Sequence, residues 1–137
     1  MTKSFITYID TAMLPVYIGF TTSKKKFEME MKRLNANTYA GCYDKKSLSN
    51  ATTTCLTKAR CGMTIIVALN TKKDPSDVEL AGLMAHESLH CLDYILDGIG
   101  EDSNAGEFRA YTIQWLVQQF MRIYEQEWKE RKKGKKK

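Results

Sequence analysis

The N-terminal part of the chain has a short apolar run followed by an amphipathic segment. Residues 14–20 have the length and apolar content of a strand. Residues 24–34 repeat apolar side chains at helical spacing, and Ser23 stands where a helix N-cap is favoured. The apolar face of this segment consists of Phe27, Met31 and Leu34. The pattern therefore predicts a strand followed by a short helix.

The middle of the chain is rich in residues that favour strands. The segments 38–43 and 51–57 are rich in Thr, Tyr and Cys. Residues 63–69, with the sequence MTIIVAL, carry β-branched side chains at their centre. The sequence predicts three further strands here, and the last is the clearest.

Beyond residue 73 the apolar positions change to a helical period. Asp74 is a favoured N-cap and Pro75 suits the first position of a helix, so we expect a helix over residues 75–97. Gly98 and Gly100 follow and are typical of a helix end.

A second long helix is predicted over residues 104–131. Its apolar side chains recur at helical spacing: Ile113, Leu116, Val117, Phe120 and Tyr124. Strands and helices are segregated along the chain, which predicts an α+β fold. We expect a short, mainly antiparallel sheet packed on two long helices.

The net charge of +5 comes from the C-terminus of this 137-residue chain. Residues 129–137 carry seven positive charges and one negative charge, so residues 1–128 have a net charge of −1. We expect one domain over 1–128 and a basic, disordered tail over 129–137. Such a tail attracts nucleic acid weakly and in a salt-dependent way, so nucleic acid is not the expected partner.

The sequence has no feature of a membrane or secreted protein. No run approaches the roughly 20 apolar residues of a membrane span, and the N-terminus lacks the pattern of a signal peptide. We therefore expect a cytoplasmic protein with reduced thiols at its four cysteines: Cys42, Cys55, Cys61 and Cys91. Cys91 is expected to pack in the core.

The chemistry of the chain is concentrated at residues 86–90, which read His-Glu-Ser-Leu-His. Two histidines four residues apart lie on one face of a helix and can both reach one zinc ion, while Glu87 lies beside them. His86 and His90 are the only histidines in the chain, and a chance match is on the order of one in a few hundred. The motif predicts a zinc site.

A third protein ligand is needed, and Glu107 is our choice. An antiparallel return of the second helix would bring its first turn back beside the histidines. Asp97, Glu101 and Asp102 remain alternatives, and Glu107 could instead form a capping box with Asn104.

Within about residues 63–120, HESLH is followed by a short turn and then by GEFRAY on a second helix. Over this region the chain resembles the gluzincin zinc peptidases. The compactness resembles the minimal members of that group, and small zincin-like domains also occur in bacteriophage genomes. The resemblance implies His86, His90 and Glu107 as zinc ligands and Glu87 as the general base that activates the zinc-bound water. It also implies that an edge strand, expected at residues 65–69, binds an extended polypeptide substrate.

Two departures from the gluzincin pattern leave an alternative open. No third histidine can stabilise the oxyanion, and Tyr111, Tyr94 and Arg109 are the candidates to replace it, with Tyr111 preferred. The position four residues after Glu107, where some members have Asp, is also Tyr111. The alternative is a zinc-stabilised binding or structural module, with a protein partner in place of a substrate. The sequence does not indicate an oligomeric state.

Overall fold

The computed structural model of the protein describes residues 6–36, 39–57, 62–101 and 105–135. Helices and strands follow one another in this order: β1 (Thr7–Tyr8), β2 (Tyr17–Thr21), α1 (Lys24–Arg33), the 3-10 turn η1 (Gly41–Tyr43), β3 (Ala51–Leu56), β4 (Thr64–Leu69), the 3-10 turn η2 (Thr71–Lys73), α2 (Asp77–Ile99) and α3 (Gly106–Lys135). The predicted α+β class is confirmed.

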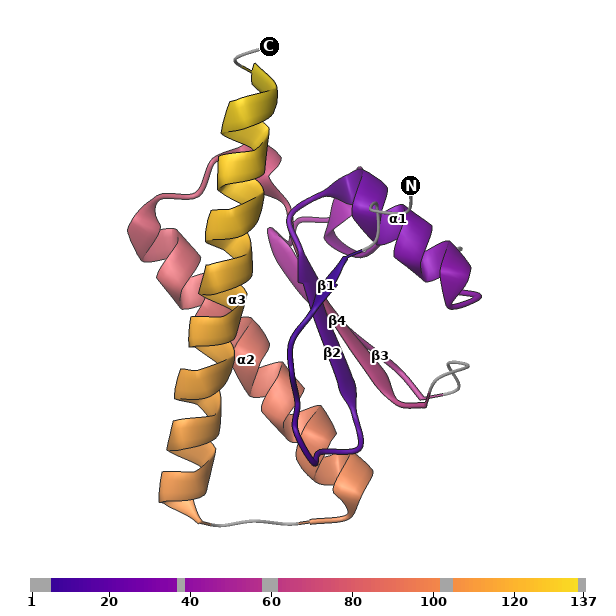
Figure 1. The fold of residues 1–137 in the computed structure, drawn as a ribbon, viewed down its shortest axis with the longest axis vertical. Coiled ribbons are helices and arrows are strands. Elements are labelled where there is room, and N and C mark those ends of the chain that lie inside the picture. The colour runs from indigo at the N-terminus through magenta and orange to yellow at the C-terminus, as the bar shows by residue number, and fades with distance from the viewer. Residues whose placement is uncertain (1–5, 37–38, 58–61, 102–104, 136–137) are drawn as a thin grey trace.

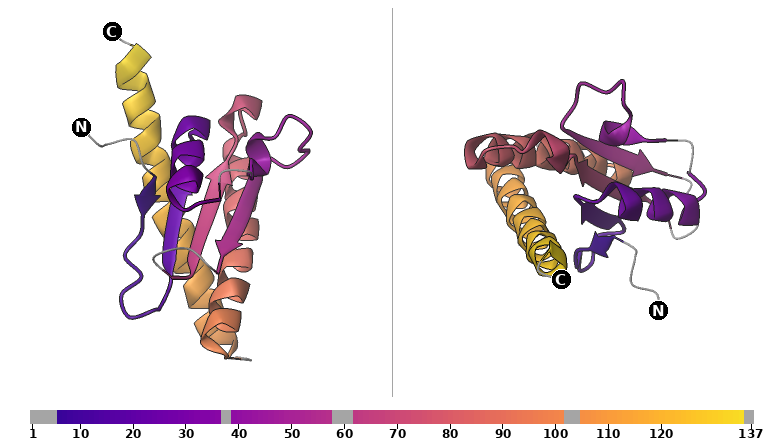
Figure 2. Two further views of the ribbon diagram at one scale, coloured as in Figure 1. Left: turned by 90° about the vertical axis from the view of Figure 1, so that its right-hand side faces the viewer. Right: turned by 90° about the horizontal axis from the view of Figure 1, so that it is seen from above.

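The strands form one four-stranded mixed sheet in the order β1-β2-β4-β3. β2 and β4 are parallel, whereas β1 pairs with β2 and β3 pairs with β4 in antiparallel fashion. The two long helices, α2 and α3, lie on one face, and α1 with η1 covers the other (Figures 1 and 2). The sheet is thus sandwiched between two helical layers of unequal size.

Strand β4 supplies side chains to both layers because successive residues point to opposite faces. Ile65, Val67 and Leu69 pack toward α2 and α3. Ile66 and Ala68 pack toward α1 and η1. All six residues of β4 are buried.

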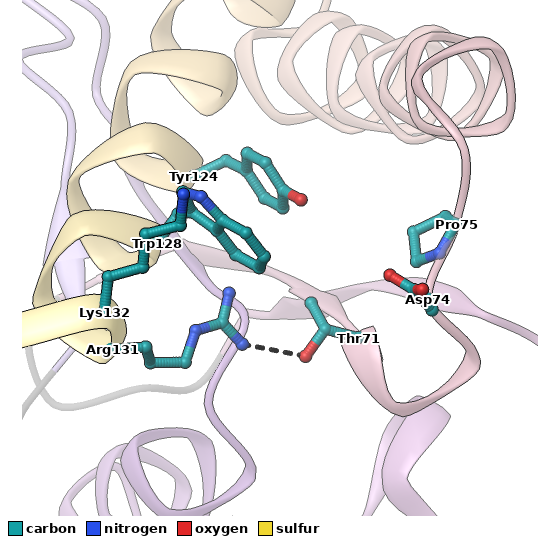
Figure 3. A pocket seen from close by; sticks show the side chains of 7 residues that line it. All are labelled: Thr71, Asp74, Pro75, Tyr124, Trp128, Arg131 and Lys132. Carbon is teal, nitrogen blue, oxygen red and sulfur yellow. Dashed lines mark hydrogen bonds between the residues drawn. The ribbon is translucent and has the colours of Figure 1, made fainter. Parts of the chain in front are cut away.

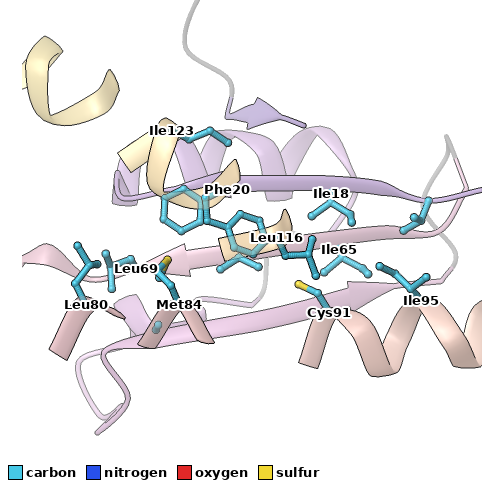
Figure 4. Packing of buried hydrophobic residues seen from close by; sticks show 14 residues of the cluster. Ile18, Phe20, Ile65, Leu69, Leu80, Met84, Cys91, Ile95, Leu116 and Ile123 are labelled. Atoms are coloured by element: carbon cyan, nitrogen blue, oxygen red, sulfur yellow. The ribbon is translucent and has the colours of Figure 1, made fainter. Parts of the chain in front are cut away.

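The main core lies between the sheet and the two long helices (Figure 4). The rings of Phe20 in β2 and Phe120 in α3 stack with their centroids 5.3 Å apart. From α2, Met84, Cys91 and Ile95 are buried in the same cluster. This packing fixes the face of α2 that is turned to the sheet, and therefore the face that carries the motif histidines.

The boundaries of α2 differ slightly from the predicted 75–97. Ser76, not Asp74, is the N-cap, and its hydroxyl accepts a hydrogen bond from the Glu79 amide at 3.2 Å. Asp74 has a φ of 44° and ends η2. Gly100 caps the other end with a φ of 72°, as predicted for a left-handed terminating glycine.

Two strand predictions were wrong. Within 38–43 the described residues form no strand: Gly41 has a φ of 54° and begins the 3-10 turn η1, while residue 38 lies outside the described part. Residues 65–69 are not at an edge, because β4 pairs with β2 on one side and β3 on the other. The edge strand beside the motif helix is β3.

Helix α3 continues through Lys135, so the described part of the segment expected to be a disordered tail is helical. The buried Glu127 anchors this end of α3 to the sheet. Its carboxylate accepts hydrogen bonds from the Thr21 hydroxyl at 2.9 Å, the Thr22 amide at 2.7 Å and the Thr22 hydroxyl. None of the described helices combines the length and apolarity that crossing a membrane requires.

Candidate metal centre

Helix α2 brings the two histidines of the motif together on its exposed side. The Nε2 atoms of His86 and His90 lie 3.1 Å apart, and the ring planes meet at 73°. Two nitrogens bound to one tetrahedral zinc at about 2.0–2.1 Å would be separated by about 3.3 Å. The two rings therefore already converge at nearly the separation that a shared metal ion requires.

Glu87 lies on a different face of α2 from the histidines. Its side chain is turned toward the sheet and is only 3% exposed. The hydroxyl of Thr53 in β3 donates a hydrogen bond to its carboxylate. The edge strand thus holds the acidic residue of the motif in a buried position.

All three motif residues are among the lining residues of a cleft between α2 and β3, the histidines from its exposed side and Glu87 from its buried side. This cleft has a volume of about 230 Å³, and its lining includes His86, Glu87, His90, Thr53 and Tyr94. A second cleft of about 390 Å³ also contains His86 and Glu87 in its lining. Together the two clefts follow the edge strand past the histidine pair.

Among the residues that the structure describes, none is brought to this pair as a third ligand. Glu107 is exposed in the first turn of α3, and within the described residues no three His, Cys, Asp or Glu side chains form a group able to hold a metal ion. Asp97 and Glu101 are also exposed outside any such group. Asp102 and Asn104 lie outside the described residues, and so does the capping-box alternative.

The predicted antiparallel return of α3 along α2 is present (Figure 1). Near the start of α3, Arg109 forms an ion pair with Asp93 of α2 at 3.6 Å. Arg109 is therefore engaged with a carboxylate and is not directed at the histidine cleft.

The two tyrosine candidates for oxyanion stabilisation differ in their placement. Tyr111 is 65% exposed on α3 and does not line either cleft beside the histidines. Tyr94 lines the smaller cleft together with His86 and His90. The geometry favours Tyr94 over Tyr111 for any role at this site.

Sequence reasoning missed Thr53, because only the packing of β3 on α2 gives this hydroxyl a partner. The prediction for Cys91 is confirmed: the side chain is fully buried in the core, and burial raises the pKa of its thiol. Cys91 therefore contributes packing rather than a metal-binding thiolate.

No protein-family model, curated protein or solved structure matches the chain.

Proposed function

We propose that the protein is a zinc-dependent peptidase in which His86 and His90 bind the metal ion. The observation that carries this proposal is the 3.1 Å separation of their Nε2 atoms on one exposed helix face, with Glu87 beside them in the same cleft. Zinc bound there would supply a Lewis acid that polarises a scissile carbonyl and acidifies water.

Proton transfer and the third metal ligand would be supplied by side chains of the protein. Glu87 would accept a proton from the attacking water and deliver it to the leaving amine, as a carboxylate can when a hydrogen bond holds it in position. Thr53 supports this role by fixing the Glu87 carboxylate. Glu107 is the proposed third ligand, because it is an exposed carboxylate in the first turn of the neighbouring helix.

Strand β3 is the proposed substrate-binding edge. It pairs with β4 on one side only, and its other edge borders the histidine clefts. An extended polypeptide can add to such an edge through main-chain hydrogen bonds. We therefore propose an unfolded or extended polypeptide as substrate.

A second candidate function is a zinc-stabilised binding module with little turnover. One observation favours it: Glu87 is almost fully buried, which limits its access to a bound substrate. For either function, we propose that the protein is located in the cytoplasm, including that of a bacteriophage host. The free thiols of Cys55 and Cys91 are typical of such a reducing compartment.

Zinc content and hydrolysis of an unfolded protein, measured for the wild type and Glu87→Gln, test the proposal. We expect about one zinc per chain in both proteins and hydrolysis only by the wild type. Zinc uptake without hydrolysis by the wild type would favour the binding module. A wild type without zinc would remove both candidates.

A further inference from the structure

Aromatic and cationic side chains gather at the end of the molecule away from the α2–α3 turn. Here η2 lies between two pockets: Thr71 lines one of them and Lys72 lines the other. The start of α1 reaches the same region, because Lys26 forms an ion pair with Glu130 of α3 at 3.4 Å. Segments far apart in the sequence therefore contribute to one surface (Figure 1).

The first pocket combines aromatic rings with positive charge (Figure 3). It has a volume of about 500 Å³, and Trp128, Tyr124, Arg131 and Lys132 form the α3 side of its lining. Asp74, Pro75 and Thr71 form the facing side. A pocket of this size accommodates a flat ring of the dimensions of a nucleobase.

The cations of this pocket lie close to the Trp128 indole. Arg131 is 5.6 Å and the Lys132 ammonium 5.1 Å from the ring centroid. One guanidinium nitrogen of Arg131 donates to the Thr71 hydroxyl at 2.9 Å. Its Nε and Nη2 have no hydrogen-bond partner in the described chain. An anion would satisfy these donors, and unsatisfied buried donors are costly.

The second pocket, of about 280 Å³, extends the positive charge past η2. Lys24, Lys45 and Lys72 line it, and Asp44 is its one acidic lining residue. All three lysines are exposed and come from three different segments of the chain. The positive charge at this end is therefore a product of the fold and not only of the C-terminal sequence.

The opposite end of the molecule carries several exposed carboxylates. Asp93 and Asp97 are exposed on the last turns of α2, Glu101 is exposed just after its C-cap, and Glu107 is exposed in the first turn of α3. Figure 1 shows this α2–α3 junction at the far end from the C-terminus of α3. Exposed carboxylates therefore gather at the end of the molecule away from the Trp128 pocket.

We propose that the basic end, formed by the Trp128 pocket and the Lys72 pocket, binds single-stranded nucleic acid. One base would stack in the Trp128–Tyr124 pocket, and backbone phosphates would contact Arg131, Lys132 and Lys72. Aromatic rings interleaved with cations are the features that recognise unpaired bases and their phosphates. Asp74 fits this ligand, because every nucleobase carries at least one N–H donor for its carboxylate.

Fluorescence anisotropy with a labelled thymidine oligonucleotide of about 12 nucleotides tests the proposal. We expect binding at about 50 mM salt that weakens steeply by about 200 mM. Lys72→Gln/Lys132→Gln should weaken binding about tenfold or more and reduce the dependence on salt. Trp128→Leu should weaken it about tenfold through lost stacking.

Matched variants separate this surface from general charge and folding effects. Lys32→Gln/Arg122→Gln removes the same charge elsewhere, and Phe108→Leu alters an exposed aromatic residue near the other end of α3. Both should bind as the wild type does, and urea denaturation should show all variants folded. The proposal is overturned by no oligonucleotide binding at low salt, or by equal losses in the control variants. Equal affinity for thymidine monophosphate, or binding only to vesicles of anionic lipid, would also overturn it.

Discussion

The hydroxyl of Thr53 donates a hydrogen bond to the carboxylate of Glu87, and this contact joins the edge strand β3 to the helix that carries the two histidines. Glu87 is 3% exposed, so its carboxylate depends on this protein partner more than on solvent. The contact links the stability of the fold to the position of the proposed general base.

Thr53→Val should therefore destabilise the protein by about 1–3 kcal/mol, because it leaves a buried carboxylate without its hydroxyl partner. The free energy of unfolding from urea titration measures this loss. Thr53→Ser keeps the hydroxyl and should retain most of the stability. A loss in Thr53→Ser as large as that in Thr53→Val would contradict the dominant role assigned to the hydrogen bond.

Glu127 provides a second anchor. Glu127→Ala should cost about 3 kcal/mol or more, since it removes a buried carboxylate that accepts three hydrogen bonds from Thr21 and Thr22. Glu130→Ala is the matched control, because Glu130 is 67% exposed and its ion pair with Lys26 should contribute less than about 1 kcal/mol. Similar unfolding free energies for the two variants would contradict the proposed anchor.

Much of the secondary structure could be predicted because local sequence and tertiary packing agree. Phe27, Met31 and Leu34 form the buried face of α1, as their spacing indicated. The segment at 38–43 differs: its β-forming residues yield to the left-handed Gly41, and Cys42 and Tyr43 reach the core from a 3-10 turn. Tertiary burial outweighs strand propensity there.

The strand order could have been inferred in part. The continuous apolar run of β4 is typical of a strand buried on both faces, whereas the threonines of β3 suit an edge. Within the site, spacing alone was enough to bring His86 and His90 together. The partner of Glu87 and the facing walls of the Trp128 pocket come from distant segments, and no local pattern encodes them.

Alkaline pH should reveal the buried phenol of Tyr43, which donates to the Leu69 carbonyl oxygen at 2.9 Å. Burial raises the pKa of Tyr43 above its ordinary value of 10.0. The unfolded chain therefore loses this proton above pH 10 while the folded chain keeps it, and stability falls as the pH rises. By about pH 11, the titration of Tyr43 should lower the free energy of unfolding by about 1.4 kcal/mol.

Tyr43→Phe isolates that contribution. The variant should be less stable at neutral pH by about 1 kcal/mol, because the hydrogen bond is lost. Its stability should fall less steeply above pH 10, so the difference from the wild type should narrow. Unfolding free energies that run parallel from about pH 8 to 11 would contradict the expected titration.

The third ligand can be identified by substitution. Glu107→Gln should weaken zinc binding by more than the roughly 10–100-fold typical of losing a supporting partner. Glu101→Gln and Asp97→Asn are matched controls, as both alter exposed carboxylates near the same helix junction. Competition with a chelating dye measures the affinities. A larger loss in either control would assign the ligand to that residue instead.

Zinc analysis of the purified protein after equilibrium dialysis, with the His86→Gln/His90→Gln double variant in parallel, tests the central claim most directly. The convergence of the two Nε2 atoms at 3.1 Å predicts about one zinc per wild-type chain and almost none in the double variant. Equal zinc contents, or a wild type that takes up no zinc, would contradict the assignment of this histidine pair as a metal site.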